Sequence, residues 1–167
     1  MLQLRASSLA DTLSIAAAVA GVARTGDLVV LAGEMGAGKT AFAKGFGAAL
    51  GVTEPITSPT FTLVHSYEAG KITLHHADIY RLTTTHQVAD LALAELLEYD
   101  GIVLLEWGDV VAQSLGDHLL VHLLADAADN DNDNDNEDAR TISISGTGRA
   151  WAARWARIEA ALAAFAC

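Results

Sequence analysis

The chain contains 167 residues, of which 51% are hydrophobic, and this is enough for one domain with a buried core. Its formal net charge of −11 would repel a nucleic-acid backbone, which excludes a protein that grips DNA or RNA directly. The single cysteine, Cys167, excludes a disulfide framework and a cysteine-based metal site, and no apolar run approaches the roughly 20 residues of a membrane span. We therefore expect one cytoplasmic domain over residues 1–167 that has no membrane contact.

The start of the chain predicts a strand, a helix and a second strand. Residues 2–4 are expected to form a short edge strand, and Ser7 or Ser8 can cap a helix over residues 9–23, where apolar side chains recur at helical spacing. After a Thr-Gly turn, residues 27–32 form an apolar run that is typical of a buried strand.

A phosphate-binding motif follows this strand. Residues 33–40 read Gly-Glu-Met-Gly-Ala-Gly-Lys-Thr and match the pattern G-x-x-x-x-G-K-[ST], with a helix predicted over residues 41–50 and capped by Gly51. Backbone N–H groups of such a loop cradle phosphate oxygens, and the positive end of the helix dipole adds to the attraction. Lys39 is expected to reach the β- and γ-phosphates, and the Thr40 hydroxyl is expected to ligate Mg²⁺. The motif therefore predicts a nucleoside triphosphate site. The residues predicted to bind the nucleotide are Glu34, Met35, Gly36, Ala37, Gly38, Lys39, Thr40 and Ala41.

The rest of the chain adds strands and one long helix. Two predicted strands, 61–67 and 71–80, are separated by a turn so short that they must form an antiparallel hairpin. A helix over residues 85–98 leads into an apolar strand at 101–106, and residues 118–124 and 140–145 supply two further strands. We therefore predict an α/β protein with a three-layer, P-loop NTPase-like fold and a mixed sheet, in which antiparallel hairpin strands extend a parallel core.

An acidic segment separates the last two predicted strands. Residues 126–138 are dominated by alternating Asp and Asn. Counted from Asp129, however, the calcium-loop pattern fails, because Asn134 occupies the glycine position and Arg140 the position of the bidentate Glu. The segment is instead expected to be a solvated, self-repelling loop with no fixed conformation.

The C-terminal residues predict a helix that packs on the core, with a helix that docks a partner as the alternative. Five large apolar side chains recur at spacings of four and three residues, which places them on one helical face, while the arginines at 149, 154 and 157 are expected on a solvated face. The five side chains are Trp151, Trp155, Ile158, Leu162 and Phe165.

Two carboxylates are candidates for nucleotide chemistry. Ligands of open α/β sheets bind beyond the carboxyl ends of parallel strands, and Glu106 ends the apolar strand at 101–106. Asp78 lies towards the end of the strand at 71–80, where alternate residues change from apolar to polar. A surface turn remains the alternative for Glu106, and an ordinary polar strand end for Asp78. The adjacent His75 and His76 face opposite ways and are expected to be structural.

Four segments in this order resemble one known family. They are the phosphate loop, Thr-Ser-Pro-Thr-Phe at 57–61, His-Ala-Asp-Ile-Tyr-Arg-Leu at 76–82, and Leu-Glu-Trp at 105–107. Together they strongly resemble the TsaE (YjeE) family of small bacterial P-loop ATPases, which are required for the threonylcarbamoyladenosine modification of transfer RNA. The phosphate loop is shared by many families, but the other three segments in this order are specific. The resemblance covers nearly the whole chain.

The resemblance implies an ATP hydrolase that uses ATP and Mg²⁺ and works with the protein subunits TsaD and TsaB, so that tRNA is reached only through the complex. By matching positions, it implies that the catalytic residues are Lys39, Asp78 and Glu106, with Thr40 and Glu106 as metal ligands and Asp78 supporting the metal or the attacking water. Residues 57–61 resemble the family's mobile switch segment. The chain departs from many relatives at Ala41, where they carry a second hydroxyl.

Two other functions are compatible with the phosphate loop. A small-molecule kinase would use the same loop and magnesium, but it usually needs a lid and a basic acceptor pocket, and the sequence has no evident arginine-rich lid. A non-catalytic nucleotide sensor would select a partner according to the bound nucleotide. Glu106 and Asp78 would be superfluous for simple binding, which argues against the sensor.

Overall fold

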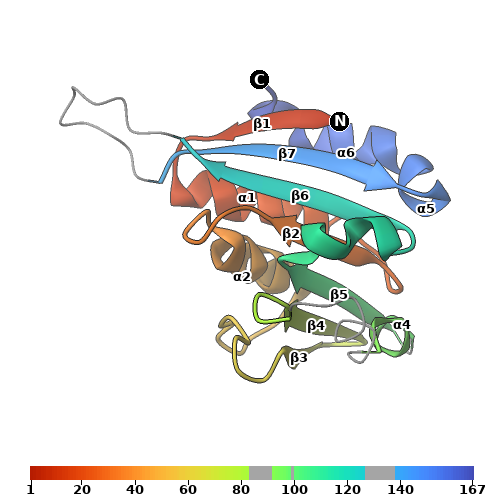
Figure 1. Cartoon of the computed structure of the whole chain (residues 1–167). Coiled ribbons are helices and arrows are strands. Elements are labelled where there is room, and N and C mark those ends of the chain that lie inside the picture. The colour runs from red at the N-terminus through yellow and green to blue at the C-terminus, as the bar shows by residue number, and fades with distance from the viewer. Residues whose placement is uncertain (83–91, 99, 127–137) are drawn as a thin grey trace.

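The computed structural model describes residues 1–82, 92–98, 100–126 and 138–167, and these residues form an α/β fold around one seven-stranded sheet (Figure 1). The strand order across the sheet is β1-β7-β6-β2-β5-β4-β3. The strands are β1 (Leu2–Ala6), β2 (Leu28–Ala32), β3 (Val64–Ala69), β4 (Ile72–Asp78), β5 (Gly101–Glu106), β6 (His118–Ala125) and β7 (Arg140–Thr147).

The sheet is mixed, as the sequence predicted. β2 lies at its centre and runs parallel to both β5 and β6, and β4 runs parallel to β5. The antiparallel strands extend this core on both sides: β3 pairs with β4, β7 with β6, and β1 with β7. Every residue of β2 and β5 is buried, which explains why both strands are apolar without alternation. The carboxyl ends of β2, β4 and β5 consequently meet at one edge of the sheet.

Helices cover the two faces of the sheet unequally (Figure 1). The larger buried cluster lies between the sheet and the helices α1, α2 and α6, whereas a smaller cluster lies on the opposite face beneath η1 and α4. No helix within the described ranges is long and apolar enough to cross a membrane. The helices are α1 (Leu9–Ala20), α2 (Lys39–Leu50), α4 (Leu93–Leu96), the 3-10 helix η1 (Gly108–Ser114), α5 (Arg149–Ala152), α6 (Trp155–Leu162) and the 3-10 helix η2 (Ala163–Phe165).

Several predicted boundaries differ from the observed ones. The first helix is capped by Ser8, as predicted, but it ends at Ala20 rather than at residue 23. β3 begins at Val64, because the residues before it form a loop in which Leu63 has a positive φ of 63°. Of the predicted helix 85–98, residues 85–91 lie outside the described part, as do residues 83, 84 and 99. The helix α4 spans only Leu93–Leu96, because Ala92 has a positive φ of 49° and residues 97 and 98 form a turn.

The C-terminal stripe is confirmed as core-facing, but it does not form one helix. Trp151, Ile158 and Leu162 are fully buried, and the chain breaks between α5 and α6. The prediction that Arg154 belongs to a solvated face is wrong, because the side chain is only 5% exposed and its guanidinium binds the buried carboxylate of Asp27. The acidic segment from 127 to 137 lies outside the described residues, so its predicted conformation and its predicted lack of calcium stay predictions.

Candidate functional site

The predicted phosphate loop connects the carboxyl end of β2 to the start of α2. Gly33, Gly36 and Gly38 have φ angles of 133°, 80° and 104°, a region that favours glycine. At Gly33 an added Cβ would also lie 2.2 Å from the carbonyl oxygen of Leu123, so a side chain there would displace β6 from the loop. The backbone of this loop therefore depends on its glycines, and it brings the N-terminus of α2 to the edge where the parallel strands end.

Lys39 is the first residue of α2, and it is buried. Its Nζ donates hydrogen bonds to the carbonyl oxygens of Gly33 and Glu34, at 2.7 and 2.8 Å, and lies 3.7 Å from the centroid of the Trp107 ring. Within the described residues no carboxylate lies within ion-pair distance of it. Burial lowers the pKa of Lys39, and the charges of the nearby carboxylates, Glu106 first, oppose that shift. Backbone carbonyls and an aromatic ring thus contact this positive charge directly, whereas the carboxylates of Glu106, Asp78 and Asp109 act on it from beyond ion-pair distance.

Glu106 occupies the position predicted for it, at the end of β5 and beside the phosphate loop. The carboxylate is only 3% exposed, and its Oε1 accepts a hydrogen bond from the Thr40 hydroxyl at 3.3 Å. The same oxygen lies 2.8 Å from Nε2 of His76 on β4. The interpretation of Glu106 as the start of a surface turn is therefore wrong, since the side chain points into the molecule and towards α2.

Asp78 lies next to Glu106, because β4 and β5 pair with these two residues in register. Its carboxylate is 4% exposed and accepts two hydrogen bonds, from the Ser58 hydroxyl at 2.8 Å and from the backbone N–H of Tyr80 at 2.9 Å. Ser58 in turn lies 3.1 Å from the Thr60 hydroxyl. The segment 57–61 and the Asp78 strand end, which are 20 residues apart in sequence, therefore form one hydrogen-bonded group.

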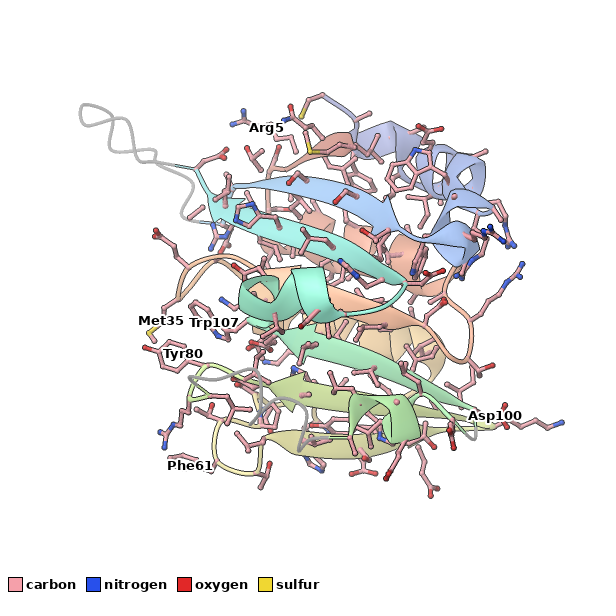
Figure 2. The ribbon with its side chains drawn as sticks, turned by 45° about the vertical axis from the view of Figure 1, so that its right-hand side comes forward. Arg5, Met35, Phe61, Tyr80, Asp100 and Trp107 are labelled. Atoms are coloured by element: carbon pink, nitrogen blue, oxygen red, sulfur yellow. The ribbon has the colours of Figure 1, made fainter. Side chains whose placement is uncertain are left out.

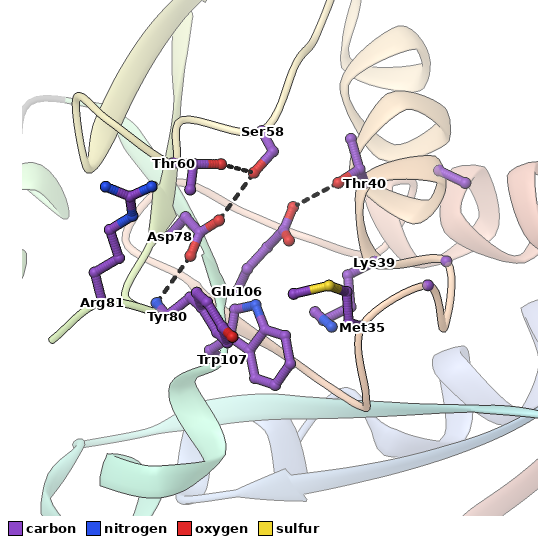
Figure 3. A pocket seen from close by; sticks show the side chains of 13 residues that line it. Met35, Lys39, Thr40, Ser58, Thr60, Asp78, Tyr80, Arg81, Glu106 and Trp107 are labelled. Atoms are coloured by element: carbon purple, nitrogen blue, oxygen red, sulfur yellow. Dashed lines mark hydrogen bonds between the residues drawn. The ribbon is translucent and has the colours of Figure 1, made fainter. Parts of the chain in front are cut away.

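These side chains surround one cavity of about 470 Å³, shown from close by in Figure 3. Carboxylates, hydroxyls and the phosphate loop meet there, so anionic and cationic ligand groups could both be bound. Glu34 and Ala37 do not line the cavity; Glu34 contributes a carbonyl oxygen to Lys39, and Ala37 is buried. The lining residues are Met35, Gly36, Gly38, Lys39, Thr40, Ala41, Ser58, Thr60, Asp78, Tyr80, Arg81, Glu106 and Trp107.

A rim of large side chains, exposed except for the half-buried Trp107, borders the cavity. Figure 2 places Met35, Phe61, Tyr80 and Trp107 along one edge of the molecule, opposite Asp100 at the other end of the parallel strands. Met35 and Phe61 are 74% and 85% exposed, and the rings of Tyr80 and Trp107 lie 4.8 Å apart. The guanidinium of Arg81 lies 4.6 Å from the Phe61 ring centroid, so this basic group is held by the segment 57–61.

Sequence reasoning missed two residues that contact the site. His76 was expected to be an ordinary structural histidine, yet its Nε2 contacts Glu106 and its buried Nδ1 has no hydrogen-bond partner in the described structure. The alternation that places His76 and Asp78 on one face of β4 was a usable signal, because β5 presents Glu106 to the same face. The second residue, Arg140, contacts the phosphate loop from β7, and no sequence pattern pointed to it.

The observed donors and acceptors fit a nucleotide with a divalent cation. Lys39 is a buried ammonium at the edge of a cavity, and the Gly36 position is open, with no atom within 4 Å of where a Cβ would be. Thr40 and Glu106 offer two oxygen ligands 3.3 Å apart, of the hard type that Mg²⁺ prefers.

Comparisons with known proteins agree on one family. Residues 6–137 match the family model described as "Threonylcarbamoyl adenosine biosynthesis protein TsaE". Two relatives described as "tRNA threonylcarbamoyladenosine biosynthesis protein TsaE" are similar in sequence: that of Bacillus subtilis is 38% identical over 72% of this chain and 75% of its own length, and that of Treponema pallidum is 39% identical over 73% and 90%. The crystal structure of Bacillus subtilis YdiB is similar in fold, with a TM-score of 0.75, 29% sequence identity and coverage of 95% of this chain and 94% of that one.

Proposed function

The chain belongs to the TsaE family of threonylcarbamoyladenosine biosynthesis, and from this premise we propose that it binds and hydrolyses ATP as a subunit of the tRNA modification machinery, together with TsaD and TsaB. One observation carries the proposal: Lys39, Thr40, Glu106 and Asp78 come from three separate segments and line the same cavity. Nucleotide binding needs only the loop, whereas hydrolysis also requires groups that hold the metal ion and orient the attacking water, and the two buried carboxylates beside the loop could provide them.

Each of these groups has a role that its position supports. Lys39 would neutralise the phosphates, and it would exchange hydrogen bonds to two carbonyl oxygens for stronger ones to phosphate oxygens. Thr40 and Glu106 would hold Mg²⁺, which supplies positive charge for the phosphates when it is bound. Asp78 would accept a hydrogen bond from the attacking water, because Ser58 and the Tyr80 N–H fix its carboxylate at the cavity wall.

Dependence on partner proteins follows from the segment 57–61. Arg81 is a basic side chain of the cavity wall that could reach a transferring phosphoryl group, but its guanidinium is stacked on the exposed Phe61. A partner that reorders this segment would change the positions of Arg81 and Asp78 together, since Ser58 and Phe61 both belong to it. Arginine groups ordered in this way are worth roughly 10³ to 10⁵ in rate in other nucleotide hydrolases. With a net charge of −11, the chain would reach tRNA only through those partners.

The test is the steady-state rate of ATP hydrolysis, measured for the chain alone, with purified TsaD and TsaB, and with each partner alone. We expect slow hydrolysis by the isolated chain and a rate at least about a hundredfold higher with both partners. The Lys39→Ala variant with both partners is the control for contaminating ATPases. A partner-independent rate would contradict the proposal. Phosphate transfer to a small acceptor would indicate a kinase, and binding without hydrolysis under every condition would indicate a sensor.

A further inference from the structure

We infer that Arg140 is a positioning residue of the phosphate site, which orients the peptide between Ala37 and Gly38 from outside the cavity. Its Nε donates to the carbonyl oxygen of Ala37 at 3.0 Å, and Nη2 lies 3.4 Å from that of Gly36. These residues are more than 100 positions apart in sequence. The inference deepens the proposed function, because it concerns the loop that would bind the nucleotide.

Arg140 acts from a rigid part of the sheet. It is the first residue of β7, and its backbone is paired on one side with Ala125 of β6 and on the other with Ala6 of β1. Its Nη1 is also anchored to the carbonyl oxygen of the preceding residue, at 2.8 Å. The guanidinium is therefore a fixed support for the loop rather than a surface side chain that touches it by chance.

The contact determines where a loop N–H points. In a trans peptide the C=O and N–H groups point in opposite directions, so a carbonyl of Ala37 that faces Arg140 turns the N–H of Gly38 away from it. Gly38 lines the cavity, whereas Arg140 is not among its lining residues. Gly36 and Gly38 have positive φ angles and no side chain, so the neighbouring peptides could adopt several orientations. A fixed hydrogen-bond donor selects one of these orientations. Preorganised N–H groups are what a phosphate-binding loop requires.

The charge of Arg140 acts in the same direction. The cavity is lined by two cationic side chains, Lys39 and Arg81, and by two carboxylates, Glu106 and Asp78, so its own lining offers a polyphosphate no net positive charge. The guanidinium of Arg140 adds a cation beside the loop carbonyls without occupying the phosphate position.

The inference is tested with Arg140→Ala, titrated with fluorescent ADP and ATP analogues in the full-length chain. We expect both affinities to fall about tenfold and by the same factor, while the melting temperature without nucleotide stays within about 2 °C of the wild type. The matched control is Arg5→Ala, because Arg5 is an exposed arginine of the neighbouring strand that pairs with Asp126 at 3.2 Å and does not touch the loop. Arg140→Lys keeps the charge but not the planar pair of donors, so its nucleotide affinities should lie between those of Arg140→Ala and those of the control.

Each outcome separates this inference from the proposed function. Wild-type affinity in Arg140→Ala, or an equal loss in Arg5→Ala, would overturn the positioning role. A lower melting temperature with unchanged affinity would also overturn it, since it indicates a purely structural contact. If Arg140→Ala does not fold, the titration of Arg140→Lys decides. If the wild-type chain itself binds neither nucleotide, then it is the proposed function that fails.

Discussion

The two ends of the central strand β2 each hold a buried cation beside a tryptophan, but the two cations are compensated very differently. Before the strand, the guanidinium of Arg154 binds both carboxylate oxygens of Asp27, at 2.6 and 2.7 Å, and lies 4.1 Å from the Trp151 ring centroid. After the strand, Lys39 lies over Trp107 and binds two carbonyl oxygens. Arg154 and Lys39 are 5% and 6% exposed, so burial alone does not distinguish them.

The difference lies in the partners of each charge. Arg154 also donates to the carbonyl oxygens of Val22 and Ala150, so each of its three nitrogens donates at least one hydrogen bond and both carboxylate oxygens of Asp27 accept one. At the other end, the nearest carboxylates bind hydroxyls and a histidine instead of Lys39. Removing one partner of such a saturated pair is strongly destabilising, and the pair leaves no charge for a ligand, whereas an unpaired buried charge is typical of a functional site.

Breaking the saturated pair should have the largest effect on stability. Arg154→Ala leaves Asp27 buried without its counter-charge, and we expect the free energy of unfolding to fall by about 3–5 kcal/mol in chemical denaturation. Nucleotide affinity of the folded variant should be unchanged. Arg157→Ala, an exposed arginine of α6, is the control and should cost less than about 0.5 kcal/mol. If Arg154→Ala lowers the free energy of unfolding by less than about 1 kcal/mol, the ion pair before β2 does not have the structural role argued here.

Removing the other buried cation, Lys39, should change nucleotide affinity and not stability. Lys39→Ala should weaken ATP binding about a hundredfold, because a charge-assisted bond to phosphate is lost, and it should leave the unfolding free energy of the nucleotide-free protein almost unchanged. Lys44→Ala, on an exposed face of the same helix, is the matched control. ATP titration and denaturation of both variants test the two halves. Unchanged affinity in Lys39→Ala would refute the phosphate-loop assignment.

The lowered pKa of Lys39 adds a dependence on pH. Because burial disfavours the protonated form, the folded protein carries a cost that is fully present below the folded pKa and is lost as the pH rises from the folded pKa to the higher unfolded pKa. The unfolding free energy of the wild type, relative to Lys39→Met, should therefore increase between neutral pH and about pH 10. Denaturation series at pH 7, 8.5 and 10 measure it. A relative decrease would mean that the carboxylates near Lys39 outweigh its burial.

Glu106→Gln tests whether the carboxylate of Glu106 binds magnesium. The substitution keeps the shape of the side chain but removes its charge, and we expect ATP hydrolysis with partners to fall about tenfold or more, with a smaller loss of ATP affinity. The magnesium concentration needed for half-maximal rate should rise. Glu68→Gln on the exposed edge strand β3 is the control. A wild-type rate and magnesium dependence would remove Glu106 from the catalytic groups.

The features of the fold that depend on neighbouring residues could be predicted from the sequence, whereas contacts between residues far apart in the sequence could not. Uniformly apolar runs predicted β2 and β5, and the short turn predicted the β3–β4 hairpin, because these depend on neighbouring residues. Glu106 could be placed beside the phosphate loop because the ends of parallel strands meet at one edge. The buried pair of Arg154 and Asp27 could not be predicted, since it depends on a helix break and on 127 residues of sequence separation.

The smallest effect is expected where the segment 57–61 meets the site, at Ser58. Its hydroxyl is one of two donors to Asp78, so in Ser58→Ala the Tyr80 N–H still holds the carboxylate and only one bond is lost. Partner-stimulated hydrolysis should fall about threefold to tenfold, and ATP affinity should stay unchanged, because Asp78 is proposed to act on water rather than on the nucleotide. Ser66→Ala on β3 removes an equivalent hydroxyl that binds His75 outside the cavity, and it should hydrolyse ATP at the wild-type rate. Equal rates in the two variants would mean that Asp78 does not depend on this segment. A loss of ATP affinity in Ser58→Ala would instead show that the segment 57–61 contributes to nucleotide binding, as Lys39 is proposed to do.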